Sequence, residues 1–158
     1  MDSNYLKTIR ILYFALAMGI VFFLMVTLLL NKLSGPFAKD DISPAERAPF
    51  LIVLIVLTGG IFTVYRAVYP KKRVAIQSMT NLDKKLAAWR ELCIMQGALI
   101  EAPAFFALVL FLLLGVYTLL VWPLTALMLF WLTQPTREKL IGDAALSSDE
   151  IDEFDAMP

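Results

Sequence analysis

The chain alternates between long uncharged segments and short segments that carry most of its charges. Residues 11–31 and 48–65 contain no Asp, Glu, Lys or Arg, and residues 92–136 contain a single one, Glu101. A bilayer core about 30 Å thick is crossed by about 20 helical residues. The first two segments are therefore each long enough for one crossing, and the third is long enough for two.

The uncharged segments predict four helices, at about residues 9–31, 49–69, 92–114 and 118–134. Gly115 and the three residues after it are expected to turn the chain between the last two helices, and Pro123 suits the beginning of a helix. A re-entrant third segment is the competing topology. We predict an all-α integral membrane domain over residues 1–142, with four transmembrane helices arranged as two hairpins.

The composition supports this class, because 59% of the residues are hydrophobic, against roughly 45–50% in a typical soluble domain. The orientation follows from the basic residues, which are more frequent in cytoplasmic segments. Both termini are predicted to be cytoplasmic, since that choice leaves few basic residues outside. Those outside are Lys32, Lys39 and Arg47, whereas those inside are Lys7, Arg10, Arg66, Lys71, Lys72, Arg73, Lys84, Lys85, Arg90, Arg137 and Lys139.

The segment at about residues 74–91 carries an apolar stripe at helical spacing. The stripe consists of Ala75, Met79, Leu82, Leu86, Trp89 and Cys93. Such an amphipathic helix is typical of a membrane surface. One interpretation places Trp89 at headgroup depth, with Lys84, Lys85 and Arg90 near anionic lipid. The other is a solvated cytoplasmic loop.

The C-terminal segment, residues 143–158, carries six acidic residues and no basic residue. Acidic tails are mostly disordered, so we expect a flexible segment. Two alternatives remain. Ser147 and Glu150 could form a capping box for a short helix that presents Ile151 and Phe154, and the tail could bind a basic partner.

Several kinds of chemistry are excluded or disfavoured by residues that the chain lacks. It contains no histidine and one cysteine, Cys93, which excludes histidine-based metal and haem sites, Ser-His-Asp catalysis and internal disulfides. No Walker loop or GxGxxG turn occurs. We therefore expect no enzyme activity, no metal, no cofactor and no nucleic-acid partner.

Glu101 is the main candidate functional residue, because an ionisable group within a transmembrane segment is costly and has a functional role by default. Gly97 and Ala104 share its helix face and would let another helix approach closely. Pro103 leaves the carbonyl of Leu99 without its usual helical donor. Gln96 lies nearer the cytoplasmic end.

Three roles of Glu101 remain open at this stage. The carboxyl group could be an ion or proton site, or it could pair with a basic residue of another subunit. It could also be a protonated interface group that hydrogen-bonds a backbone carbonyl, a glutamine, or a threonine such as Thr58, Thr63 or Thr125. Separately, Gly59 and Gly60 in the second helix favour close packing against another helix.

The stretch from Trp89 to Phe106, which contains the run ALIEAPAFF, resembles small bacterial four-helix membrane proteins that carry an ALxEGPAxF-like segment. This resemblance implies a bacterial inner-membrane protein and adds no activity. A superficial similarity to the proteolipid subunits of rotary ATPases is opposed by the position of Glu101 on the first helix of its hairpin.

Two functions follow from these observations. The first is a structural or accessory subunit that self-associates or joins a membrane complex through helix packing. The alternative is a proton or cation conductor that uses Glu101.

Overall fold

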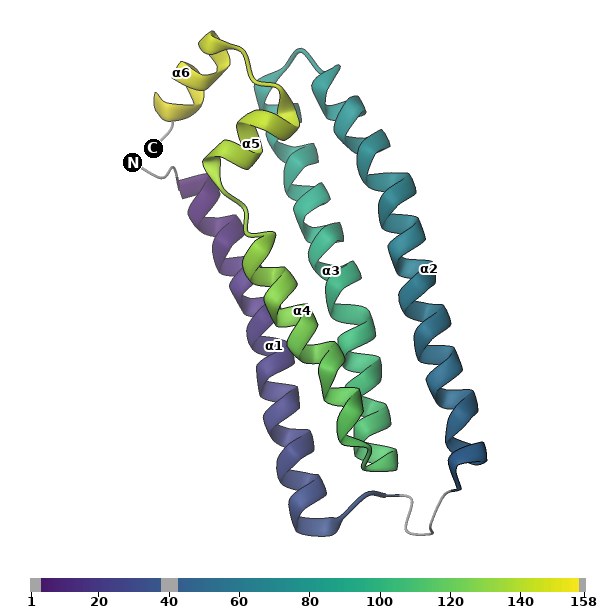
Figure 1. Cartoon of the computed structure of the whole chain (residues 1–158). Helices are drawn as coiled ribbons and strands as arrows, with labels where there is room; N and C mark the ends of the chain where they lie inside the picture. Colours follow the sequence, from purple (N-terminus) through teal and green to yellow (C-terminus); the bar gives the residue numbers. More distant parts are fainter. Residues whose placement is uncertain (1–3, 38–42, 157–158) are drawn as a thin grey trace.

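The computed structural model describes residues 4–37 and 43–156, and this part of the chain consists of helices joined by short connections. The long helices are α1 (Asn4–Ser34), α2 (Pro44–Gln77) and α3 (Leu82–Leu114). A short 3₁₀ helix, η1 (Tyr117–Leu120), leads into α4 (Val121–Leu132), and α5 (Arg137–Ala144) and α6 (Ser148–Ala156) follow. The start of α1 lies at the same end of the bundle as α5 and α6 (Figure 1).

The first three helices are each long and apolar enough to cross a membrane. The fourth segment meets that test only when η1 and α4 are taken together with α5, and these two parts are bent by 80°. The third segment is one continuous helix of 33 residues, about 50 Å long. The helix is unbroken within Leu82–Leu114, so the bent part that follows it is the one that is either a broken span or a re-entrant loop.

The helices extend beyond the uncharged segments because their ends are capped. Ser43 and Glu46 form a capping box at the start of α2, and the Asn81 side chain accepts a hydrogen bond from the Lys84 amide at the start of α3. Both caps satisfy amide groups that a helix start leaves without partners. The segment at about residues 74–91 is consequently divided between the end of α2 and the start of α3.

Gly115 ends α3 in the left-handed conformation, with φ of 66°. Its amide donates to the carbonyl of Phe111 over 2.8 Å. A Cβ atom at this position would lie 3.1 Å from Cβ of Pro36, in the segment after α1. The turn therefore uses glycine both for its backbone conformation and for this close approach.

The long helix α3 is the centre of the bundle and contacts α1, α2, α4 and α5. Of the most apolar 18-residue stretch of each helix, 39% is buried in α3 but only 6% in α2. The main core lies around α1, α3 and the C-terminal helices and includes the fully buried side chains of Trp89, Leu140 and Phe154. The second helix is thus the least enclosed of the four.

Candidate functional site

Glu101 lies on the side of α3 that faces α1, next to Gly19. A Cβ atom on Gly19 would be 3.6 Å from Oε1 of Glu101 and 3.9 Å from Cζ of Phe105. The Glu101 side chain is half-buried. Within residues 4–37 and 43–156 the carboxyl group has no hydrogen-bond or ion-pair partner. Gly19 provides the space beside it, and the surroundings are mainly apolar.

The three threonines considered as partners of Glu101 are bonded elsewhere. Thr58, Thr63 and Thr125 each donate to the backbone carbonyl four residues earlier in their own helix. Thr58 also accepts a hydrogen bond from Nε1 of Trp122 over 3.1 Å, which joins α4 to α2. A hydrogen bond from Glu101 to one of these threonines, which was one of the open alternatives, is therefore absent among the described residues.

Gly97 and Ala104, which share a helix face with Glu101, are both buried. A Cβ atom on Gly97 would lie 2.9 Å from Cδ1 of Leu16 and 3.4 Å from Cε2 of Tyr13, both in α1. This face therefore brings α1 close to α3. Pro103 lies inside α3, which continues through it.

Gly59 and Gly60 have the opposite surroundings. Both are exposed, and no atom lies within 4 Å of a Cβ atom placed on either. The expected packing of these glycines against another helix is therefore absent within the described part of this chain. They form an open position on α2, which packs against α3 and α5 with its other side.

Gln96 belongs to a polar group at the end of the bundle that carries α5. Its Nε2 donates to the Tyr65 hydroxyl over 3.3 Å, and its Oε1 accepts from Nζ of Lys139 over 3.0 Å. The same ammonium group donates to the carbonyl of Thr133 over 3.1 Å. Gln96 is five residues from Glu101, about 7.5 Å along the helix axis, and it serves a different site.

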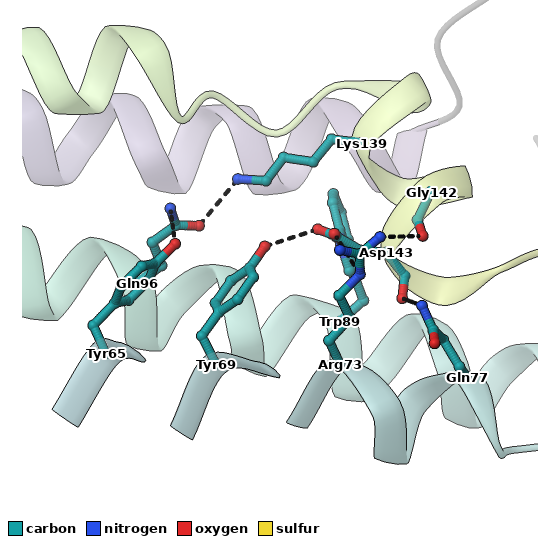
Figure 2. Close-up of polar contacts among 9 residues, drawn as sticks. All are labelled: Tyr65, Tyr69, Arg73, Gln77, Trp89, Gln96, Lys139, Gly142 and Asp143. Atoms are coloured by element: carbon teal, nitrogen blue, oxygen red, sulfur yellow. Dashed lines mark hydrogen bonds and ion pairs between the residues drawn. The ribbon is translucent and has the colours of Figure 1, made fainter. Parts of the chain in front are cut away.

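Asp143 is the centre of a polar cluster, and Figure 2 shows donors converging on it from α2 and α3. Its carboxylate accepts from the Tyr69 hydroxyl over 3.0 Å and from Nε1 of Trp89 over 3.4 Å. Nε of Arg73 lies 3.2 Å from the other carboxylate oxygen. The Asp143 backbone carbonyl accepts from Gln77 over 3.2 Å. This buried carboxylate is fully engaged and joins α5 to α2 and α3.

The cluster around Asp143 was not identified from the sequence, where Asp143 was counted among the acids of the tail. One signal could have indicated it. Tyr65, Tyr69, Arg73 and Gln77 recur every fourth residue, which places them on one face of a helix. A polar face that continues from an apolar segment into a basic one indicates an interaction, although the spacing does not identify the partner.

The four residues expected at the membrane interface have different surroundings in the fold. Trp89 is fully buried in the protein core, where its indole donates to the Asp143 carboxylate, so its side chain does not face lipid. Its position at headgroup depth stays a prediction. Lys85 is also buried, and its ammonium group lies 2.7 Å from the Glu150 carboxylate. Lys84 and Arg90 are exposed. The part of the apolar stripe from Leu82 to Cys93 thus forms protein core, whereas Ala75 is exposed.

The acidic segment, described as far as residue 156, folds back onto the bundle, in contrast to the flexible tail expected from its charge. Ser147 and Glu150 form the reciprocal hydrogen bonds of a capping box. Phe154 is buried and meets the Tyr5 ring edge-on, with ring centroids 6.1 Å apart. The physical reason is that α6 combines one buried aromatic side chain with charges that match basic residues of the same chain.

Two ion pairs hold α6 against the bundle and lower the pKa values of two of its acids, Glu150 and Asp155. The hydrogen bond from Lys85 and that from the Ser147 amide lower the pKa of Glu150. Arg137 lies 2.6 Å from the Asp155 carboxylate, and this hydrogen bond lowers the pKa of Asp155. Both shifts favour the charged, docked form of α6.

The described residues contain no group of three or more His, Cys, Asp or Glu side chains that could hold a metal ion. Glu101 therefore offers one carboxylate, which suits a proton or a partly hydrated monovalent cation better than a structural metal. The cluster at Asp143 is suited to holding helices together.

Comparison with known proteins adds a family but no activity. No curated protein and no solved structure matched the chain. A family described as a domain of unknown function, DUF6574, matches residues 1–139. The match covers all four apolar segments and ends before Asp143 and α6. The chain therefore belongs to the DUF6574 family.

Proposed function

We propose that this protein is a non-catalytic accessory subunit of the bacterial inner membrane that associates with a second copy of itself through α2. In this proposal four segments cross the bilayer as two hairpins and both termini are cytoplasmic. The distribution of basic residues supports this orientation, because the starts of α1, α3 and α5 lie at the same end of the bundle (Figure 1). These starts carry Lys7, Arg10, Lys85 and Arg137. The resemblance to small bacterial four-helix membrane proteins supports the location.

The observation that carries the proposal is the open position at Gly59 and Gly60. In hydrocarbon, where burial of apolar surface gives no driving force, helices associate where small residues let backbones approach. Gly97 shows how this chain uses a glycine when a helix does pack on it, with Leu16 in close contact. Gly59 and Gly60 have no such neighbour in the part of the chain that the structure describes. A second copy is the simplest partner, because two-fold dimers use the same patch on both subunits.

Cysteine cross-linking in native membranes tests this association. In a Cys93→Ala background, Gly60→Cys is expected to form a covalent dimer under mild oxidation. Phe22→Cys is the matched control, since Phe22 is exposed but lies on α1 instead of α2. Dimers with Gly60→Cys alone support the proposal. Equal cross-linking at both positions, or none at either, contradicts it.

A second candidate function is proton or cation conduction, and a specific observation favours it. The Glu101 carboxyl group has no polar partner among the described residues and lies beside the space left by Gly19. An unpaired acid at this depth is costly unless a proton, a cation or water satisfies it. The geometry supports this role less well, because a single carboxyl group provides no relay.

Glu101→Gln separates the two functions, because it retains the shape of the side chain and removes its titration. Flux into liposomes that is lost in Glu101→Gln and retained in Glu91→Gln supports conduction. Glu91 is a suitable control because it is an exposed acid in the same helix. Absence of flux with the unchanged protein, or equal flux in both variants, rejects conduction.

A further inference from the structure

A groove of about 390 Å³ runs between α1 and α4 on the outside of the bundle. This volume lies within the range of small-molecule sites, roughly 300–1,000 Å³. Side chains from both helices form its surface. They include Arg10, Tyr13, Ala17, Val21, Leu127 and Trp131.

The groove is apolar along its length and charged at one end. Its floor includes the buried rings of Tyr13 and Phe130, which meet edge-on at 5.1 Å between centroids. Trp131 stands at its side with 76% of its surface exposed. Ala17 and Val21 continue the apolar surface away from Arg10. From residue 10 to residue 21 the groove follows about 16 Å of helix.

Arg10 is held at the charged end by its neighbour in the α4–α5 connection. Its Nε donates to the carbonyl of Pro135 over 3.1 Å. Lys7, one turn earlier in α1, is exposed and adds a second positive charge at this end of the helix. Basic positions between transmembrane helices on the cytoplasmic side are suited to anionic lipid headgroups.

We propose that the groove between α1 and α4 binds one anionic glycerophospholipid, with an acyl chain along Ala17 and Val21 and the phosphate near Arg10. The inference rests on the proposed membrane placement, with Arg10 at the cytoplasmic side. The ligand matches the groove because it also joins one charged end to a long apolar part. A zwitterionic lipid fits the apolar part of the groove equally well, but its headgroup is attracted less strongly to the basic end.

Native mass spectrometry of the full chain released from nanodiscs tests the site. The discs contain equal amounts of phosphatidylglycerol and phosphatidylcholine, and the retained lipids are counted. We expect the unchanged protein to retain one lipid, with phosphatidylglycerol preferred. Arg10→Gln should lower that preference about fivefold, which is the effect of one basic residue near an anionic surface. Arg10→Lys should restore most of it.

Two further variants test the lipid site even if Arg10→Gln loosens the contact with Pro135. Ala17→Phe fills the groove while leaving Arg10 in place, so it should lower retention of both lipids. Lys84→Gln removes an exposed positive charge at the start of α3 and should change neither. If Arg10→Gln and Ala17→Phe both retain lipid as the unchanged protein does, the proposed lipid site is rejected. It is also rejected if a second copy of the chain occupies the groove.

Failure of this site and failure of the membrane placement give different results. If the protein stays in the membrane fraction after an alkaline wash but retains no preferred lipid, only the lipid site is rejected. If the protein is released by the wash, the membrane placement is rejected together with the site.

Discussion

Two acids of this chain, Asp143 and Glu101, illustrate opposite ways of placing a carboxyl group. Asp143 is buried, and Tyr69, Arg73 and Trp89 all contact its side chain. Glu101 is half-buried and has no polar partner among the residues that the structure describes. Groups that are fully bonded stabilise one arrangement, whereas an unpaired group remains available to a proton, an ion or another molecule. Asp143 therefore stabilises the fold, whereas the Glu101 carboxyl group is available to a ligand.

The same contrast separates the C-terminal part of α2 from its middle. Its C-terminal part is bonded to α5 through Tyr69, Arg73 and Gln77. In its middle, Thr58 is bonded to Trp122, but among the described residues no atom lies within 4 Å of a Cβ atom placed on Gly59 or Gly60. A helix whose C-terminal part is bonded to the bundle, and whose middle has one uncovered side, is suited to present that side to a partner.

The largest effect is expected from Asp143→Ala. The change leaves the buried Trp89 indole without its acceptor and Arg73 without its ion pair. We expect the free energy of unfolding to fall by about 1.5–3 kcal/mol, the range for hydrogen bonds to charged groups. Chemical unfolding in mild detergent measures it. Asp149→Ala, at an exposed acid of α6, is the control, and an equal loss there would contradict the special role of Asp143.

A smaller loss is expected from Gly97→Val, because the added atoms meet Leu16 and Tyr13. Overpacking of this kind costs about 1–3 kcal/mol. Gly60→Val is the matched variant on α2, where the added atoms meet open space. It should leave the stability of a single copy nearly unchanged and weaken only the association of copies. Equal destabilisation by both variants would remove the distinction between the two glycines.

The docking of α6 is expected to depend on pH. Lys85 and the Ser147 amide lower the pKa of Glu150 in the folded chain, below the ordinary value of about 4.3. The stabilisation is therefore fully present above that ordinary value and is lost as the pH falls through the lowered pKa. Hydrogen exchange of residues 148–156 should accelerate in this acidic range. Glu150→Gln should remove much of this dependence, and Glu153→Gln should retain it.

The smallest effect on stability is expected from Glu101→Gln, because this carboxyl group has no hydrogen bond to lose within residues 4–37 and 43–156. We expect a change within about 0.5 kcal/mol, as for substitutions away from specific interactions. Unfolding in the same detergent measures it beside Asp143→Ala. A loss of stability as large as that of Asp143→Ala would show that Glu101 has a structural partner and would contradict the contrast between the two acids.

The sequence predicted the apolar helices well, since uncharged segments of about 20 residues have few alternatives to a helix. It predicted their ends less well, because the caps at Ser43 and Asn81 carry the helices into charged segments. The stripe that includes Trp89 was detected, but an apolar stripe has the same spacing whether it meets lipid or protein. Only the folded chain shows that α5 covers it.

The cluster at Asp143 depends on contacts between residues far apart in the sequence. Tyr69 and Asp143 are separated by 74 positions, and no local pattern relates them. The tail was expected to be flexible on the basis of its charge alone. Its basic partners, Lys85 and Arg137, lie in segments whose position relative to α6 is set by the packing of α3 and α5.

The proposed association through α2 is the central claim, and the number of copies per complex tests it most directly. Membrane discs extracted without dissociating the protein, with one fluorophore per chain, allow bleaching steps to be counted. We predict two steps for the unchanged protein and one for Gly60→Val, with Phe22→Val on α1 retaining two. A single step for the unchanged protein, or two steps for Gly60→Val, would contradict the account.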